Sequence, residues 1–151
     1  MSSTVSRTPG ILLGLGLGGF VDGILLHQIV HWHNMGSARL PPVTFEALQT
    51  NMRWDGFFHA AVWIFCVVGL YRLLRDARRG LLLPGPRAFT GLLLMGWGMF
   101  NLIEGSIDHH LLTLHHVRDV PVHVPLYDWV FLVVFGIGLI ALGRWMSRAA
   151  V

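Results

Sequence analysis

The chain has 151 residues, of which 54% are hydrophobic and only 13% are charged. This length corresponds to a single domain, and this composition excludes an ordinary soluble globular protein. The net charge is only +3, and the chain has no basic patch interleaved with exposed aromatic residues, so no nucleic-acid partner is expected. A single cysteine, Cys66, excludes an internal disulfide.

Four apolar runs follow one another along the chain, at about residues 11–33, 55–71, 88–110 and 126–146. Each is close to the ~20 residues that a helix needs to cross a bilayer. The first run has the charge pattern of a secretory signal, but it continues through Asp22, His27 and His31 without a cleavage site, so it is expected to be retained. The sequence predicts an all-α, four-helix transmembrane bundle over residues 11–151, preceded by a cytoplasmic tail of residues 1–10.

The arginines give the predicted orientation. Eight of them lie at the two chain ends or between the second and third runs, and only Arg39, Arg53 and Arg118 lie in the other two connections. The positive-inside rule therefore places both termini in the cytoplasm.

Glycines and connections complete the expected architecture. Gly14 and Gly18, like Gly19 and Gly23, are four residues apart, which predicts close helix packing within the bundle or against another subunit. The second helix is expected to begin near Asp55, after an outer loop over residues 36–52. No internal repeat and no low-complexity tract is evident.

The histidines and most acids lie toward the outer ends of the apolar runs or in the outer loops. Two helical hairpins bring these ends together at one membrane face. Ionisable side chains within membrane spans are costly and usually functional, and a shared metal ion would neutralise them. The arrangement therefore predicts a His/carboxylate metal site near the periplasmic face.

Three pairs with i,i+4 spacing are candidate ligands, because this spacing places two side chains on one helix face. These pairs are His27/His31, Asp55/His59 and Glu104/Asp108, and His109 adjoins the last of them. Nitrogen and carboxylate ligands without thiolate suit Fe, Zn or Cu ions, in a site of one or two metals. The predicted metal ligands are His27, His31, Asp55, His59, Glu104, Asp108 and His109.

Other interpretations of these side chains remain open. A single membrane histidine is often an interhelical hydrogen-bond partner, and Asp55 is also a candidate N-cap of the second helix. Asp22 lies about 180° around its helix from His31 and deeper in the membrane, so it is not expected to share that face. Whether His115, His116 and His123 join the site is also open.

Several blocks of the sequence resemble a bacterial family of predicted four-span inner-membrane proteins that is catalogued as a domain of unknown function. The resemblance rests on Gly19–Gln28, Trp32-His33, Asp55–His59, Phe100–Gly105, Asp108–His110 and His115–Arg118, and it covers nearly the whole chain after the tail. It implies a multi-pass protein of the bacterial inner membrane. It implies no activity.

The site leaves several functions open. The first is a metal-dependent oxidoreductase or a factor that handles metal for respiratory enzymes, and a membrane zinc hydrolase is closely related. The second is a small cytochrome with two histidines as haem ligands. The third is a proton-relay or purely interacting subunit. The expected partners are the lipid bilayer and either a second copy of the chain or respiratory-chain proteins.

Overall fold

The computed structural model describes residues 5–148, and these residues form four long helices. Three of the four contain a π-helical segment, written η, in which the backbone winds more widely than in an α-helix. The all-α, four-helix prediction is confirmed. In chain order the segments are α1 (Thr8–Asp22) with η1 (Gly23–Ile29), α2 (Phe45–Arg78), α3 (Pro86–Glu104) with η2 (Gly105–Leu111), and α4 (Pro125–Val130) with η3 (Phe131–Gly138) and α5 (Leu139–Arg148).

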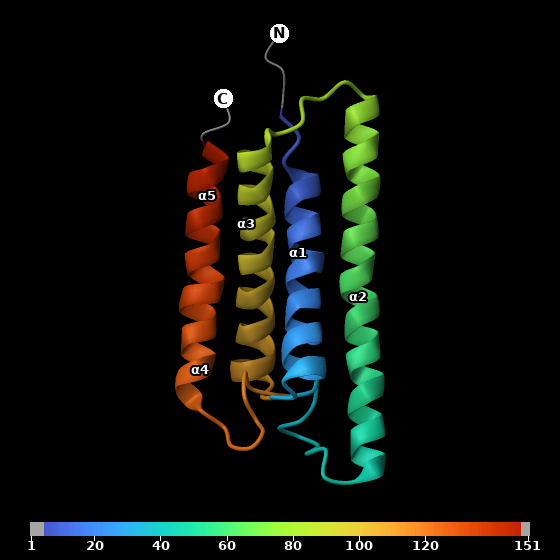
Figure 1. Ribbon diagram of the computed structural model, residues 1–151, viewed down its shortest axis with the longest axis vertical. Helices are drawn as coiled ribbons and strands as arrows, with labels where there is room; N and C mark the ends of the chain where they lie inside the picture. The colour runs from blue at the N-terminus through green and yellow to red at the C-terminus, as the bar shows by residue number, and fades with distance from the viewer. Residues whose placement is uncertain (1–4, 149–151) are drawn as a thin grey trace.

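Helices α1 and α3 form the centre of the bundle, with α2 packed on α1 and α5 packed on α3 (Figure 1). The start of α1, the end of α5 and the connection between α2 and α3 lie at one end of the bundle. The two histidine-rich connections lie at the opposite end. The side of a membrane that each end faces remains a prediction from the arginines.

Three helices are long and apolar enough to cross a membrane: Thr8–Ile29, Phe45–Arg78 and Pro125–Arg148. The remaining helix, α3 with η2, carries Asn101, Glu104, Asp108 and two histidines in its second half, which lowers its hydropathy. It lies between α1 and α5, so its neighbours cover two of its sides. The buried side chains are mainly polar, whereas many large apolar side chains are exposed, as expected for a helical protein surrounded by lipid.

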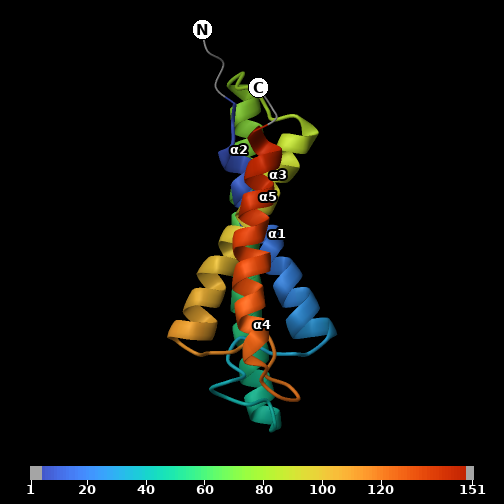
Figure 2. The same cartoon turned by 90° about the vertical axis from the view of Figure 1, so that its left-hand side faces the viewer.

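Helices α1 and α3 cross where Gly14 faces Gly96. A Cβ atom on Gly14 would lie 2.9 Å from the Cα of Gly96, and a Cβ on Gly96 would lie 2.8 Å from the Cα of Gly14. The backbones therefore meet at a separation that only glycine permits, so this glycine face packs within the bundle. Beyond the crossing the two helices diverge, and the histidine-rich connections lie at the end where they are farthest apart (Figure 2).

Helix α2 begins earlier than the sequence analysis predicted. It starts at Phe45, and the Thr44 hydroxyl caps it by accepting a hydrogen bond from the backbone N–H of Ala47. The predicted loop over residues 36–52 is therefore too long. The alternative role of Asp55 as an N-cap is wrong, because Asp55 lies in the third turn. Of the predicted N-terminal tail, residues 1–4 lie outside the described part, and α1 begins at Thr8.

The two halves of the chain repeat the same structure, which corrects the expectation that there is no internal repeat. The segments η1 and η2 have equal length, and each is followed by one residue in the left-handed region, His31 (φ 50°) and Thr113 (φ 46°). Equivalent residues of the two halves are 82 positions apart in the sequence. Ser37 and Asp119 are one such equivalent pair, and their side chains hydrogen-bond to each other.

The contacts between the two halves are reciprocal. Ala38 donates a backbone hydrogen bond to Leu114, and its equivalent Val120 donates one to Trp32, which is the equivalent of Leu114. Such exchange of identical contacts is the property of a twofold relation. The bundle is therefore built from two similar helical hairpins that face each other at the histidine-rich end.

Candidate metal centre

In each half of the bundle, the acid that directly precedes the π-helix lies beside a histidine within that π-helix. In the first half, Asp22 Oδ2 lies 3.3 Å from His27 Nε2. In the second half, Glu104 Oε1 lies 3.2 Å from His109 Nε2. Both pairs have i,i+5 spacing, which an α-helix separates by about 140°. The wider π-helical turn, with its i→i+5 hydrogen bonds, brings these side chains onto the same face.

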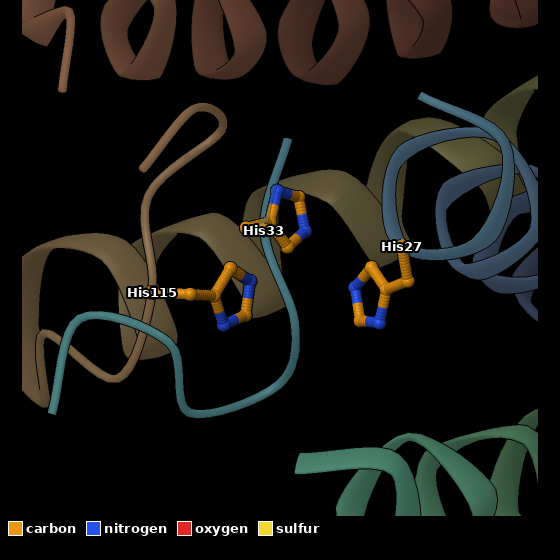
Figure 3. Close-up of side chains that lie close together, drawn as sticks. All are labelled: His27, His33 and His115. Atoms are coloured by element: carbon orange, nitrogen blue, oxygen red, sulfur yellow. The ribbon is translucent and has the colours of Figure 1, made fainter. Parts of the chain in front are cut away.

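A second histidine in each half comes from the connection after the π-helix. His33 and His115 are almost fully buried, and their rings stack with centroids 4.4 Å apart. His27 lies beside them, with its ring centroid 4.5 Å from that of His33 (Figure 3). On the other side, the centroids of His109 and His115 are 4.9 Å apart. Four imidazoles from both hairpins thus form one buried cluster.

The Nδ1 atom of each of these four histidines faces an oxygen atom from another part of the chain. His27 Nδ1 lies 3.0 Å from Asp55 Oδ1, and His109 Nδ1 lies 3.4 Å from Asp128 Oδ1. His33 Nδ1 donates to the carbonyl oxygen of Val117 at 2.9 Å, and His115 Nδ1 donates to that of Met35 at 3.2 Å. These contacts place the Nδ1 atoms on the outer side of the cluster, so the Nε2 atoms lie on its inner side.

The inner atoms have the properties of metal ligands. Among residues 5–148, the buried His27 Nε2, His33 Nε2 and Glu104 Oε2 atoms have no hydrogen-bond partner. Two overlapping triads, His27/His33/His115 and Glu104/His109/His115, each place three ligand atoms within 4.8 Å of one another. Ligating histidines usually hold their other ring nitrogen against a carboxylate or carbonyl, as His27, His33 and His115 do here. These buried clusters can therefore hold a metal ion.

The two histidines that come from the connections have pKa values shifted in opposite directions. Burial, together with the neighbouring His115 and His27, lowers the pKa of His33 well below its usual value, so His33 is neutral at pH 7. Burial also disfavours a charge on His115, but the 2.8 Å hydrogen bond from its Nε2 to Glu104 outweighs burial and raises its pKa. His33 therefore offers a lone pair, while His115 shares a proton with Glu104 at the position that a metal ion would take.

The structure brings some of the predicted ligands together. His27, Glu104 and His109 lie in the cluster, and Asp55 contacts it through His27 Nδ1. Asp108 is buried as well, but it belongs to none of the His/carboxylate triads of the described residues.

The structure places the other two predicted ligands outside the cluster. His31 is exposed and follows the end of η1, so the expectation that it shares a helix face with His27 is wrong. His59 is half-buried, packs against Gly23 and stacks on Phe20, and its Nδ1 donates to the carbonyl oxygen of Asp55. The i,i+4 pair Asp55/His59 therefore does not converge on one ligand position.

Four residues of the cluster and its surroundings were not among the predicted ligands: Asp22, His33, His115 and Asp128. The expectation that Asp22 lies apart from the histidines assumed α-helical geometry throughout, and η1 overturns it. A signal for three of them is present in the sequence. An acid, a glycine and two histidines recur with identical spacing at Asp22-Gly23/His27/His33 and at Glu104-Gly105/His109/His115.

An apolar cavity of about 420 Å³ adjoins the cluster between η1 and η3. Its walls are mainly aliphatic and aromatic side chains, but they include Asp22 and Asn101. The amide nitrogen of Asn101 donates to the carbonyl oxygen of Phe135, and its buried Oδ1 has no partner among residues 5–148. The cavity wall thus includes one amide and one carboxylate, and the carboxylate belongs to the candidate metal centre.

Comparison with known proteins gives a family but no activity. The family model described as "Predicted membrane protein (DUF2243)" matches residues 9–150, so the chain belongs to this family of predicted membrane proteins. No curated protein and no solved structure shows a significant match to the chain.

Proposed function

We propose that this protein is an integral membrane metalloprotein that binds two transition-metal ions, one in each half of the buried cluster. The observation that carries the proposal is the set of four buried imidazoles whose Nδ1 atoms face oxygen atoms while their Nε2 atoms face one another or an acid. An apolar interior tolerates such a set of polar groups when a metal ion neutralises it.

The proposal of two ions follows from the repeat. Asp22 Oδ2 lies 3.3 Å from His27 Nε2 and 4.0 Å from His33 Nε2. Glu104 Oε1 lies 3.2 Å from His109 Nε2 and 2.8 Å from His115 Nε2. Each half thus offers one carboxylate and two imidazoles, a ligand set suited to Fe, Zn or Cu. The carboxylates also favour metal ions over haem, whose pocket is apolar apart from its axial ligands.

Metal analysis of the full chain tests this proposal directly. Protein purified in detergent without added chelator should contain about two buried ions that survive gel filtration. The matched control is His31→Ala, which removes an exposed histidine of the same hairpin and should leave the content unchanged. One ion per chain would favour a single site on His27, His33 and His115, and metal content near zero after growth with Fe, Zn and Cu would overturn the proposal.

The cavity supports a function in which the metal centre acts on a membrane-soluble substrate, and we propose an oxidoreductase of this kind. A bound metal would supply redox chemistry at the inner wall of the cavity, next to Asp22. The cavity walls suit an aromatic or alkyl body, and we take Asn101 in its wall as the acceptor for a hydroxyl donor. Phenols and hydroquinones are the substrate class that meets both requirements.

Fluorescence quenching tests the cavity independently of the metal. Trp32 and Trp97 line it, so 4-bromophenol should quench their fluorescence saturably, and 4-bromoanisole, which lacks the hydroxyl donor, should bind more weakly. Filling the cavity by Val130→Phe should weaken binding roughly 10-fold, or about 1.4 kcal/mol. The control is Val133→Phe, an exposed position of η3 outside the cavity. Equal quenching by both compounds in all variants would contradict the proposed substrate class.

The orientation of the site is also proposed from the arginines. Because the histidine-rich end is opposite the chain ends, a cytoplasmic location of the chain ends would place the metal centre near the periplasmic face of the inner membrane. A reporter enzyme that is active only in the periplasm should therefore be inactive when fused to the C-terminus.

A further inference from the structure

A third group of ligand-type side chains lies outside the buried cluster, at the surface of the histidine-rich end. It consists of His116 and His123 from the connection between η2 and α4, and Asp128 from α4. His116 Nδ1 lies 2.9 Å and His123 Nε2 lies 3.1 Å from the same oxygen, Asp128 Oδ2. The two rings stack with centroids 3.8 Å apart, so both nitrogens approach this oxygen from the same side.

This group differs from the buried cluster in its exposure to solvent. The His123 side chain is 39% exposed and that of His116 is 18% exposed, whereas Asp128 is 4% exposed. A metal ion can therefore reach the two imidazoles from water. The carboxylate that would hold it is buried, and the backbone N–H of Val117 holds it in place. Two histidines and one carboxylate with open positions are a common ligand set for exchangeable divalent transition metals.

Asp128 joins the surface group to the buried cluster. Its Oδ2 faces His116 and His123, while its Oδ1 accepts a hydrogen bond from the backbone N–H of Val117 and lies 3.4 Å from His109 Nδ1. The ring centroids of His116 and His109 are 6.4 Å apart. A single carboxylate thus separates a solvent-accessible ligand pair from a histidine of the buried centre.

The first half of the repeat provides an internal comparison. The equivalent of His116 is Asn34, whose amide nitrogen donates a 2.7 Å hydrogen bond to Asp55 Oδ2. Asn34 therefore reproduces the hydrogen bond of His116 without offering an imidazole. If residue 116 only had to hydrogen-bond the carboxylate, an asparagine would be sufficient, as Asn34 shows in the first half. The histidine at this position therefore requires a different explanation.

We propose that His116, His123 and Asp128 form a separate, exchangeable site for a divalent transition metal, through which ions enter the buried centre. The existence of this surface site is independent of the buried ions, whereas its role as an entry point rests on the proposed function. Capture of cations at this surface site raises their local concentration, which is expected to increase the loading rate of the buried centre about 10-fold or more.

The test uses the full chain in detergent, stripped of metal and then loaded with Zn²⁺. Transfer of Zn²⁺ to a colorimetric chelator should show a fast phase of about one equivalent from the surface site and a slow phase from the buried centre. His116→Asn, which copies the first half, should remove the fast phase, keep the slow equivalents and slow the loading of the buried centre about 10-fold. His110→Asn, an exposed histidine outside all three groups, should change neither phase.

The outcomes separate the two proposals. A fast phase that persists in both His116→Asn and His123→Asn would overturn the surface site. Loss of the fast phase with an unchanged loading rate would overturn the entry role. A wild-type protein that binds only the fast equivalent would support the surface site and contradict the buried centre. Helical content measured by circular dichroism should match that of wild type in His116→Asn and His123→Asn, because residues 116 and 123 lie outside the helices.

Discussion

The two halves of this bundle share one arrangement of an acid and two histidines and differ in what surrounds it. Both place an acid, a π-helical histidine and a histidine of the following connection at equivalent positions. Only the second half adds the surface group with His116 and His123, where the first half has Asn34. The acid and histidines that both halves share therefore belong to the proposed buried centre. The histidines found in the second half alone belong to the proposed site through which metal ions exchange with solvent.

The largest expected effect comes from removing the residues that the halves bring into contact with each other. The double variant His33→Ala/His115→Ala removes the stacked pair and should abolish binding of the two buried ions, because each half loses one imidazole. Metal content by mass spectrometry measures this. The result would be uninformative if the protein unfolded, so His33→Gln/His115→Gln should give the same loss with the helical circular-dichroism signal of wild type. Full metal content in the glutamine variant would contradict the proposal that His33 and His115 bind the buried ions.

The two acids should have equal roles in spite of their different lengths. Asp22→Asn and Glu104→Gln each keep the shape of the side chain and remove its charge, so each should lose one of the two buried ions. Both variants together should lose both ions. If Asp22→Asn left the metal content intact while Glu104→Gln removed everything, the two halves would not be equivalent and a single ion bound by the second half would explain the data.

The carboxylates behind the histidines should have a smaller effect. Asp55→Asn and Asp128→Asn alter the partner of a ligand rather than a ligand, and such changes typically weaken metal affinity about 10–100-fold. Competition with a chelator of known affinity measures this. Asp128→Asn should also weaken the surface site, because Asp128 Oδ2 contacts His116 and His123, whereas Asp55→Asn should not. Equal effects of both variants on the exchangeable ion would contradict the assignment of Asp128 to the surface site.

The smallest expected effect concerns the packing that holds the halves together. Gly96→Ala places a Cβ 2.8 Å from the Cα of Gly14 and should destabilise the bundle by ~1–3 kcal/mol. Gly56→Ala is the matched control, because a Cβ there meets no atom within 4 Å and alanine favours the helix by roughly 0.5–1 kcal/mol. Thermal unfolding in detergent compares the two, and a Gly96→Ala protein as stable as wild type would contradict a tight crossing.

The residues that sequence reasoning found and missed follow a physical pattern. His27, Glu104 and His109 were recognised because acids and imidazoles in apolar runs are rare and costly. His31 was expected in the site because i,i+4 spacing was assumed to mean a shared face, which holds only for a continuous α-helix. His59 does lie in a continuous α-helix, but its Nδ1 donates to the carbonyl oxygen of Asp55. Asp22 was set apart for the same reason, and the i,i+5 geometry of η1 reverses that expectation. His33 and His115 lie in connections, whose path no helical period predicts.

The amino-acid sequence alone determined that this chain is a bundle of four helices, that its ionisable groups gather at the end opposite the chain ends, and that glycines line a helix contact. These properties depend on composition and on the period of a helix, because lipid accepts apolar surfaces and excludes unpaired charge. Only the tertiary structure decided which side chains meet. The π-helical turns shift the register of both central helices, and the two connections run across the open end of these diverging helices. The residues that meet therefore depend on backbone geometry that a regular helical period does not encode.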